Sequence, residues 1–441
     1  MKVPAIKGFD EAAFNKYLKN TGWLMIARVA SMGIKILVSI ALSNYLLKTK
    51  LGIYSFPTAF CTFFIAAAAL GLDGFVTREL LRKPEKKDLL LGTAFFLKLA
   101  GGLTVLPLIY LTYTLLNNQE PIATPLSYVL TVGLTAAIQA FNIIESYFQS
   151  RTQAKYIMRV QVSANLISAA TKMTFILLGL DIAWFIGALL FDAVILASGY
   201  LLSYQKHGGS VRKWTFDRRI AGYLLSKSWP LAFSAILIYV YMRIDQLMIE
   251  RYLGVGAMGI YTNVVMLAEA WYFIPVAIVT SVFPAIMNAR RDDPVRYIRR
   301  LQDLYDLMVW VGLSAAISVS IFAPLIFDLL LNDEFAPGAP ILSVHIWSAI
   351  FVFLSTASGQ YLIAEGLVKL TLVRNALGAV VNVVLNIFWI PKYGIMGAAY
   401  ATLIAYIVNN FWILLLPRTR QQGIMMLKSL SLISLVEKLR R

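Results

Sequence analysis

The sequence predicts an all-α membrane protein, with twelve transmembrane helices in two six-helix bundles related by a pseudo-two-fold axis along the membrane normal. Three observations lead to this fold class: long runs of apolar residues, basic residues that gather in alternate connections between these runs, and a motif that occurs twice. Together they predict a chain that crosses the bilayer repeatedly and that arose by duplication of a six-helix unit.

Apolar residues dominate the composition. Of the 441 residues, 59% are hydrophobic and only 14% are charged, and the mean hydropathy is +0.70. A soluble domain normally has about 25% charged residues. The apolar residues gather in runs of roughly 20, the length of a helix that crosses the hydrocarbon core. Spans are predicted at residues 21–47, 52–72, 89–116, 122–149, 156–178, 182–204, 229–250, 256–285, 305–331, 339–364, 367–390 and 395–416.

Lysine and arginine predict the orientation of these spans. If the N-terminus is cytoplasmic, the inner segments carry dense basic groups such as Arg82-Lys83 and Arg290-Arg291. The basic residues of the outer connections are only Lys48, Lys50, Arg251 and Lys392. Because cytoplasmic loops are enriched in Lys and Arg, this split predicts an even number of spans and two cytoplasmic termini. It also accounts for the net charge of +17 without a nucleic-acid partner.

A motif near the first connection occurs again halfway along the chain. Tyr45-Leu46 and Leu51-Gly52-Ile53-Tyr54 return, without gaps, as Tyr252-Leu253 and Met258-Gly259-Ile260-Tyr261. Weaker matches place Tyr147 and Lys155 opposite Tyr361 and Lys369, and Ile186-Gly187-Ala188 opposite Met396-Gly397-Ala398. Such repeats are typical of transporters, which place the substrate path between the two copies. Chance similarity between apolar helices is the alternative.

The repeat and the charge pattern together predict the domain organisation. Residues 1–20 form a polar cytoplasmic N-terminus, because they contain neither a short apolar core nor a small-residue cleavage site of a signal peptide. The N-terminal bundle is predicted at 21–205, a cytoplasmic linker at 206–228 and the C-terminal bundle at 229–416. The tail at 417–441 is predicted to be cytoplasmic, either as an amphipathic helix on anionic lipid or without structure.

Besides Lys369, at the cytoplasmic end of the span 367–390, seven basic residues fall inside the predicted spans. They are Arg28, Lys35, Lys98, Arg159, Lys172, Arg243 and Arg374. An Arg or Lys at the bilayer centre costs about 2.5–3.5 kcal/mol even on insertion scales, so the deep ones must face water or a partner. Arg159 and Arg374 lie near the cytoplasmic end, where a long side chain can reach the interface.

This surplus of positive charge predicts a cavity for an anion such as a diphosphate, since Arg holds phosphate oxygens in pairs and Lys acts as a point charge. The predicted cationic cavity contains Arg28, Lys35, Lys98, Lys172, Arg243 and Arg374. The alternative is that these residues only form structural ion pairs.

Polar residues recur on single faces of three spans. Gln161, Asn165, Ser168 and Lys172 follow a helical spacing, as do Arg243 with Gln246, and Asn375 with Asn382 and Asn386. The predicted polar lining of the cavity is therefore Gln161, Asn165, Ser168, Gln246, Asn375 and Asn382.

Carboxylates inside spans suggest an ion-coupling site, because a buried carboxylate can take up a proton or bind sodium. The candidates are Asp245 and Glu269, followed by Glu145 and Asp192. The alternative is that each only neutralises a nearby basic residue. No cofactor or metal centre is predicted, since a single cysteine, Cys61, and two histidines exclude a Cys/His cluster.

The motifs resemble those of a known family. Arg243-Ile244-Asp245-Gln246, followed by Tyr252-Leu253-Gly254 and Gly259-Ile260-Tyr261, resembles the segment from the seventh to the eighth helix of bacterial O-antigen (Wzx-type) polysaccharide flippases. These belong to the multidrug/oligosaccharidyl-lipid/polysaccharide (MOP) exporter superfamily, whose fold is MATE-like. Leu51-Gly52-Ile53-Tyr54 with Gly71-Leu72 and Arg78, and Phe322-Ala323-Pro324 before Leu329-Leu330, resemble two further regions of the family.

The resemblance implies a flippase in the bacterial cytoplasmic membrane. Its substrate would be an undecaprenyl-diphosphate-linked oligosaccharide, destined for O-antigen, capsule or exopolysaccharide, and alternating access would be coupled to a H⁺ or Na⁺ gradient. A monomer is expected in the lipid bilayer, with a polysaccharide polymerase or glycosyltransferases as candidate associates.

Two other functions stay open at this point. A multidrug or other cation antiporter of the same superfamily should have an acidic cavity, whereas the surplus here is basic. A membrane glycan polymerase or lipid-dependent glycosyltransferase would need catalytic groups in a sizeable outer loop, and the outer connections, such as 117–121, are short. The sequence therefore favours a transporter over an enzyme.

Overall fold

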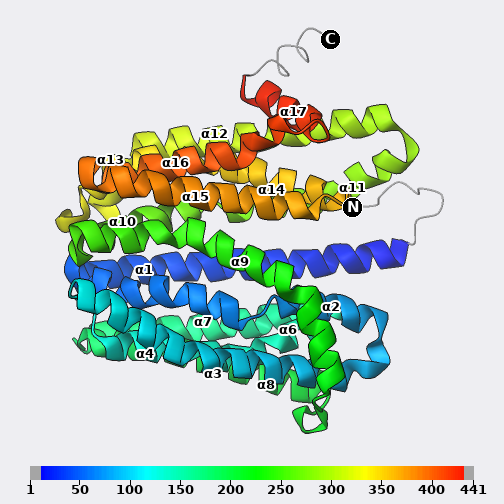
Figure 1. The fold of residues 1–441 in the computed structure, drawn as a ribbon, viewed down its shortest axis with the longest axis horizontal. Coiled ribbons are helices and arrows are strands. Elements are labelled where there is room, and N and C mark those ends of the chain that lie inside the picture. Colours follow the sequence, from blue (N-terminus) through cyan, green and yellow to red (C-terminus); the bar gives the residue numbers. More distant parts are fainter. Residues whose placement is uncertain (1–10, 432–441) are drawn as a thin grey trace. The chain divides into compact units, whose positions relative to one another are not determined.

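The computed structural model describes residues 11–431, without the side chains of residues 11–21, 24, 26–28, 284–285, 291–292 and 368. Every regular element of this part is a helix (Figure 1). The α-helices are α1 Glu11–Ala68, α2 Leu72–Arg82, α3 Lys87–Gln119, α4 Leu126–Gly133, α5 Thr135–Ile138, α6 Ile143–Ser150, α7 Ala154–Leu177, α8 Ile182–His207, α9 Arg218–Leu253, α10 Val255–Glu269, α11 Phe273–Asp292, α12 Pro294–Leu330, α13 Gly338–His345, α14 Ser348–Ala364, α15 Val368–Tyr393, α16 Ile395–Phe411 and α17 Arg420–Leu430. Single 3₁₀ turns lie at Pro84–Lys86, Gln139–Asn142, Val211–Lys213, Asp333–Phe335 and Trp412–Leu415.

Length and hydropathy identify 10 candidate membrane spans within the described residues. They show an all-helical, multi-span membrane protein, as predicted, but they do not confirm the predicted number of twelve. The first candidate, Val29–Arg82, has 54 residues, far more than the ~20 that one crossing requires. α7, with 24 residues, is not among the candidates, because it carries the polar residues of one predicted stripe.

The chain divides into two compact units, each assembled from separate segments. The first comprises Met1–Lys35, Phe64–Tyr110 and Leu130–Ala232, and the second Ile36–Phe63, Leu111–Val129 and Phe233–Arg441. This division follows contacts in space, whereas the predicted bundles at 21–205 and 229–416 follow the repeat. The predicted bundle boundaries therefore stay a prediction.

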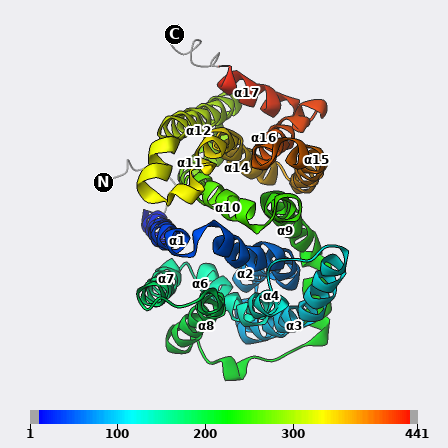
Figure 2. The same cartoon turned by 90° about the vertical axis from the view of Figure 1, so that its left-hand side faces the viewer.

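The first unit is held together by an aromatic core. Phe148, Tyr200 and Tyr204 are fully buried, and Tyr147 meets Tyr204 edge to face. Figure 2, which looks along the helices, shows α6, α7 and α8 grouped together. Such aromatic pairs add about 0.5–1.5 kcal/mol beyond the burial of their area. The core therefore fixes α6 against α8 at one end of the unit.

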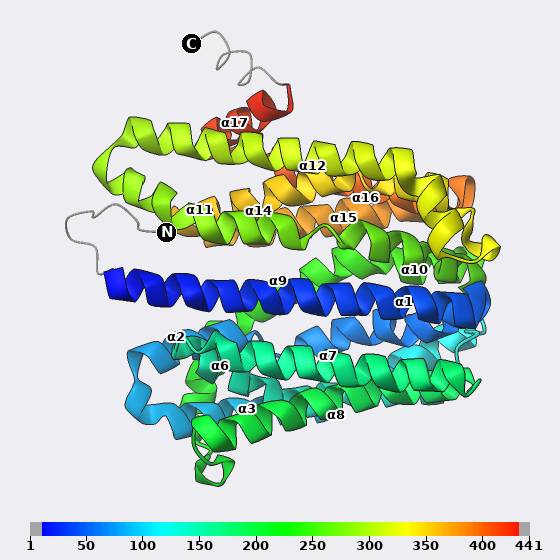
Figure 3. The same cartoon turned by 180° about the vertical axis from the view of Figure 1, so that it is seen from behind.

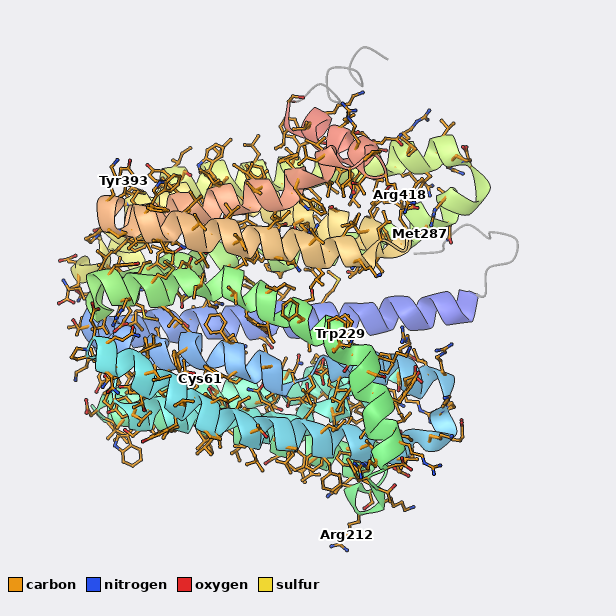
Figure 4. All side chains as sticks on the ribbon, viewed as in Figure 1. Cys61, Arg212, Trp229, Met287, Tyr393 and Arg418 are labelled. Atoms are coloured by element: carbon orange, nitrogen blue, oxygen red, sulfur yellow. The ribbon has the colours of Figure 1, made fainter. Side chains whose placement is uncertain are left out.

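The predicted linker at 206–228 is partly helical. α8 ends at His207 and α9 begins at Arg218, and Arg212 lies in the connection between them (Figure 4). The Asp217 carboxylate accepts hydrogen bonds from the backbone N–H groups of Arg219 and Ile220, at 2.7 and 3.0 Å. These two bonds cap the start of α9, and they lower the pKa of Asp217 below its ordinary value.

The second unit packs α12, α14, α15 and α16 side by side. α11 and α12 run antiparallel, with the turn at Asp293 (Figure 3). The predicted tail helix begins as α17, and it docks on α12 through Gln422, whose amide donates to the Tyr305 hydroxyl at 2.7 Å. Residues 432–441 of the predicted tail and 1–10 of the predicted N-terminus lie outside the described residues.

The two copies of the motif have the same backbone conformation. Leu47 has φ 60° and ψ 174°, which breaks α1, and its counterpart Gly254 has φ 84° and ψ 171°, which separates α9 from α10. The shift that aligns Tyr147 with Tyr361 likewise aligns Thr152 with Gly366, and both have positive φ. Helix breaks thus recur at equivalent positions, which supports duplication over chance similarity.

The two copies also touch each other reciprocally. A Cβ on Gly52 would collide with the Val255 carbonyl, and a Cβ on Gly259 would collide with the Lys48 carbonyl. Lys48 and Val255 are counterparts under the same shift that relates Gly52 to Gly259. The contact is therefore two-fold symmetric, and both positions need glycine because backbone fills the place of a side chain.

Replacing Gly254 by alanine should destabilise the protein although no atom lies within 4 Å of the new Cβ. Gly254 has a φ of 84° with an extended ψ, a backbone conformation that only glycine adopts readily. A residue with a side chain in this conformation is destabilised by about 1–3 kcal/mol. Thermal unfolding of the purified variant measures the effect. Gly256→Ala, two residues further along α10 and without positive φ, is the control, and equal unfolding temperatures would contradict the prediction.

Candidate functional site

Three of the predicted cavity cations are paired with carboxylates. Lys98 Nζ lies 2.7 Å from Asp73 Oδ1, and Lys172 Nζ lies 2.6 Å from Asp192 Oδ2 in the same unit. In the second unit the Arg243 guanidinium lies 2.8 Å from Glu269 Oε2. These pairs are the arrangement that the ion-pair alternative predicts. The carboxylates nevertheless keep accessible surface, 52% of the side chain for Asp73 and 29% for Asp192.

The remaining predicted cations have different surroundings. Lys35 is exposed and Arg159 is also exposed, whereas Arg374 is only 5% exposed. The Arg374 guanidinium donates to Ser358 Oγ at 3.3 Å and to the Ser355 carbonyl at 3.4 Å. The side chain of Arg28 lies outside the described residues.

The stripe on α7 faces two other helices of the first unit. Gln161 donates to the Tyr200 hydroxyl of α8 at 3.0 Å, and Asn165 donates to Ser31 Oγ of α1 at 2.7 Å. Lys172 donates to Ser168 Oγ at 3.0 Å as well as to Asp192. The stripe is therefore a polar contact of α7 with α8 and α1, and its predicted place in the lining of a cavity stays a prediction.

Glu145 joins the Gln161 end of this network. Tyr200 donates to Glu145 Oε2 at 2.9 Å, and the Gln149 amide donates to Oε1 at 2.9 Å. Both carboxylate oxygens of Glu145 thus accept a hydrogen bond. Among the described residues, no Lys or Arg forms an ion pair with Glu145.

Asp245 on α9 is the centre of a second network, in the second unit. It is 2% exposed. Tyr261 donates to its Oδ2 at 2.6 Å, Thr402 donates to the same oxygen at 3.3 Å, and the Gln246 N–H donates to Oδ1 at 2.8 Å. No Lys or Arg of the described residues forms an ion pair with Asp245, since Arg243 pairs with Glu269.

Asparagines of α15 continue the network. The Asn382 amide donates to Thr402 Oγ1 at 3.2 Å, and the Asn386 amide donates to Asn382 Oδ1 at 3.0 Å. Both asparagines are fully buried, and the Asn386 Oδ1 atom has no hydrogen-bond partner among the described residues. Asn375, the third member of the predicted stripe, instead approaches Ser234 Oγ at 3.5 Å.

A small cavity adjoins Asp245. It is lined by Tyr241, Met242, Asp245, Val265, Glu269, Tyr272, His345, Thr402 and Tyr406, and it has room for roughly one water-sized species. The helices α9, α10, α13 and α16 converge here. The site thus combines an unpaired buried carboxylate, neutral oxygen donors and space for a small ion.

The sequence prediction missed several members of this site. Tyr261 closes the repeated motif, so its place in the repeat could have indicated it. Thr402 and His345 lack such a signal, because their role depends on which helices meet. Asp73 follows Gly71-Leu72 of a family-like segment, but it lies beyond the predicted second span and was not considered as an intramembrane acid.

The fold matches solved transporters of the MOP superfamily. An inward-facing multidrug resistance MATE transporter superposes with a TM-score of 0.72 at 15% identity, covering 90% of this chain and 95% of that one. The lipid II flippase MurJ in an inward closed conformation superposes with a TM-score of 0.70 at 15% identity, covering 95% and 92%. The protein therefore has the MATE/MurJ-like fold.

The sequence itself defines the family. The model of the polysaccharide biosynthesis protein family matches residues 17–290, and the chain belongs to this family. An uncharacterized membrane protein of Methanocaldococcus jannaschii is 20% identical over 90% of this chain and 83% of its own. The probable flippase AglR of Haloferax volcanii is 26% identical over 38% of this chain and 36% of its own.

The family match is to polysaccharide biosynthesis, and the fold is that of the solved MATE and MurJ structures. Both of these sequence relatives are archaeal. The candidate spans show a multi-pass membrane protein, and its location in a bacterial inner membrane stays a prediction.

Proposed function

We propose that the protein is a flippase that moves a lipid-diphosphate-linked oligosaccharide from the inner to the outer leaflet of the cytoplasmic membrane by alternating access. Membership of the polysaccharide biosynthesis family carries the proposal, and the name of the Haloferax volcanii relative supports it. The chemistry agrees, because Lys and Arg residues lie deep inside predicted spans and a diphosphate needs cations.

The proposal assigns the substrate diphosphate to Arg28, Lys35, Lys98, Lys172, Arg243 and Arg374. Lys98, Lys172 and Arg243 are held by carboxylates that keep accessible surface. In our proposal phosphate oxygens compete with these carboxylates for the same cations. While the substrate is absent, the carboxylates would lower the free-energy cost of these cations in the membrane, since a charge without a partner is costly there.

We further propose that Asp245 binds the ion that drives transport, H⁺ or Na⁺. An ionised carboxylate buried without an ion-pair partner is unfavourable, so binding of a proton or a cation would relieve the burial of the Asp245 charge. Thr402, which lines the cavity beside Asp245, supplies a neutral oxygen of the kind that hard cations prefer. Glu269, Glu145 and Asp192 remain secondary candidates.

The proposed topology has twelve crossings, two six-helix halves and both termini on the cytoplasmic side. The break at Leu47 divides the 54-residue candidate into two crossings, and α7 is long enough, at 24 residues, to add another. The reciprocal Gly52 and Gly259 contacts support the two halves.

Lys98→Met should weaken substrate binding more than Asp73→Asn does. Loss of a charge-assisted contact to phosphate is worth about 1.5–3 kcal/mol, or roughly 10–100-fold in apparent affinity. The measurement is the half-saturating concentration of the lipid-linked oligosaccharide for transport. If the pair is only structural, the two single variants will be equally impaired and the double variant will be no worse than either.

A binding competition tests the proposed substrate class. The protein in lipid nanodiscs is loaded with a fluorescent lipid-diphosphate oligosaccharide and is then titrated with unlabelled lipid-diphosphate oligosaccharide or with a cationic dye. Displacement by the diphosphate lipid alone is expected. Binding of the dye in its place would instead favour the multidrug antiporter alternative.

A further inference from the structure

His345 lies at the edge of the Asp245 site and has no role in the proposed function described so far. It is the last residue of α13, immediately before the break that leads to α14, and it is only 4% exposed. Its imidazole lines the same cavity as Asp245. His345 Nδ1 lies 3.4 Å from the Tyr261 hydroxyl, and the two rings meet edge to face.

The hydrogen-bond donors between Asp245, Tyr261 and His345 can be assigned by counting hydrogens. The Tyr261 hydroxyl has a single hydrogen, and its 2.6 Å distance to Asp245 Oδ2 is typical of O–H donation to a carboxylate. That hydrogen cannot also be given to His345. When Asp245 is ionised, the bond between His345 and Tyr261 is therefore donated by the imidazole, so that Nδ1 carries a hydrogen.

We propose that His345 is a positioning residue for the ion site, a role that rests on the proposed ion-binding function of Asp245. By donating to the phenol oxygen, His345 holds the Tyr261 hydroxyl so that its hydrogen stays on Asp245. His345 touches neither the carboxylate nor the ion. It acts through Tyr261, much as groups behind a ligand fix its orientation in other ion sites.

The arrangement explains why a polar ring is buried in an apolar helix. Burial of a polar group without a hydrogen bond is unfavourable, and Tyr261 is the hydrogen-bond partner of the His345 ring. Tyr261 is itself fully buried. Without His345 its oxygen would no longer accept a hydrogen bond from the imidazole, and the hydroxyl could rotate away from Asp245. An ion held by Asp245 would then meet a less ordered carboxylate.

Three variants test the role. His345→Leu removes the donor, whereas His345→Asn keeps an N–H group close to the position of Nδ1. Tyr261→Phe removes the hydroxyl through which His345 is proposed to act. Each variant is checked for folding by thermal unfolding, and transport of a fluorescent lipid-diphosphate oligosaccharide is then measured across a series of Na⁺ concentrations and a series of pH values.

His345→Leu should raise the half-saturating concentration of the driving ion about tenfold and leave the maximal rate unchanged. His345→Asn should stay close to the wild type. Tyr261→Phe should match His345→Leu, and the double variant should be no worse than either, because both act through one hydroxyl.

Two outcomes contradict the inference and are distinguishable from each other. If the wild type responds to Na⁺ or to pH but His345→Leu has the same half-saturating concentration, His345 does not position the site and the function of Asp245 stands. If the wild type responds to neither ion, the proposed coupling fails and the role of His345 fails with it.

Discussion

Replacement of Asp245 by asparagine is expected to abolish ion-driven transport while the protein stays folded. Asparagine has nearly the same shape and still accepts the hydrogen bond from Tyr261, but it has no negative charge. Asp245 is buried, and no Lys or Arg of the described residues forms an ion pair with it. Its negative charge is therefore available to bind a cation or a proton. We expect the apparent affinity for the driving ion to fall by at least about 100-fold, which removes the response at the gradients imposed.

The measurement is the rate of transport under an imposed Na⁺ or pH gradient in proteoliposomes. Asp328→Asn is the matched control, because it makes the same chemical change at an exposed position on α12 of the same unit. Asp245→Asn should respond to neither gradient, whereas Asp328→Asn should behave as the wild type. An Asp245→Asn protein with the gradient dependence of the wild type would refute the assignment.

Replacement of Gly259 by alanine is expected to destabilise the protein, and replacement of Gly52 should act in the same way. A Cβ on Gly259 would occupy the place of the Lys48 carbonyl, and a Cβ on Gly52 that of the Val255 carbonyl. Backbone cannot move aside as a flexible side chain can, so the two segments would have to separate. Overpacking of this kind costs about 1–3 kcal/mol, occasionally more.

Gly256 is the control on the same helix. A Cβ there meets only Thr49 Oγ1 and Lys48 Cγ, at 3.8 and 3.9 Å, and alanine favours a helix over glycine by roughly 0.5–1 kcal/mol. Thermal unfolding should therefore show a lower midpoint for Gly259→Ala and an unchanged or higher one for Gly256→Ala. The same midpoint for both variants would show that the reciprocal contact is not close.

The sequence allows much of the scaffold to be predicted, because the forces involved are local or periodic. Apolar runs of the right length predicted a multi-span helical membrane protein, and Gly52 and Gly259 could be matched because a duplication leaves the same spacing. That these glycines would contact each other's segment was not predictable. It depends on how distant helices meet, as does the continuation of helix between the first two predicted spans with only a break at Leu47.

The site was predictable only in part, for a related reason. A carboxylate such as Asp245 is conspicuous in an apolar run, and the spacing of Gln161, Asn165 and Ser168 reveals their common face. Thr402 is unremarkable in a membrane helix. The repeat points to Tyr261, but the bonds of Tyr261 and Thr402 to Asp245 could not be inferred from spacing. The partners of Lys98, Lys172 and Arg243 were equally hidden, since each lies on a different helix from its cation.

The appearance of a lipid-diphosphate oligosaccharide in the outer leaflet of proteoliposomes, measured with and without an ion gradient, tests the central proposal most directly. Wild-type protein should move the lipid faster than protein-free vesicles do, and an imposed Na⁺ or pH gradient should change that rate. Vesicles that translocate the lipid no faster than protein-free controls under either gradient, or that transport a cationic dye instead, would contradict it.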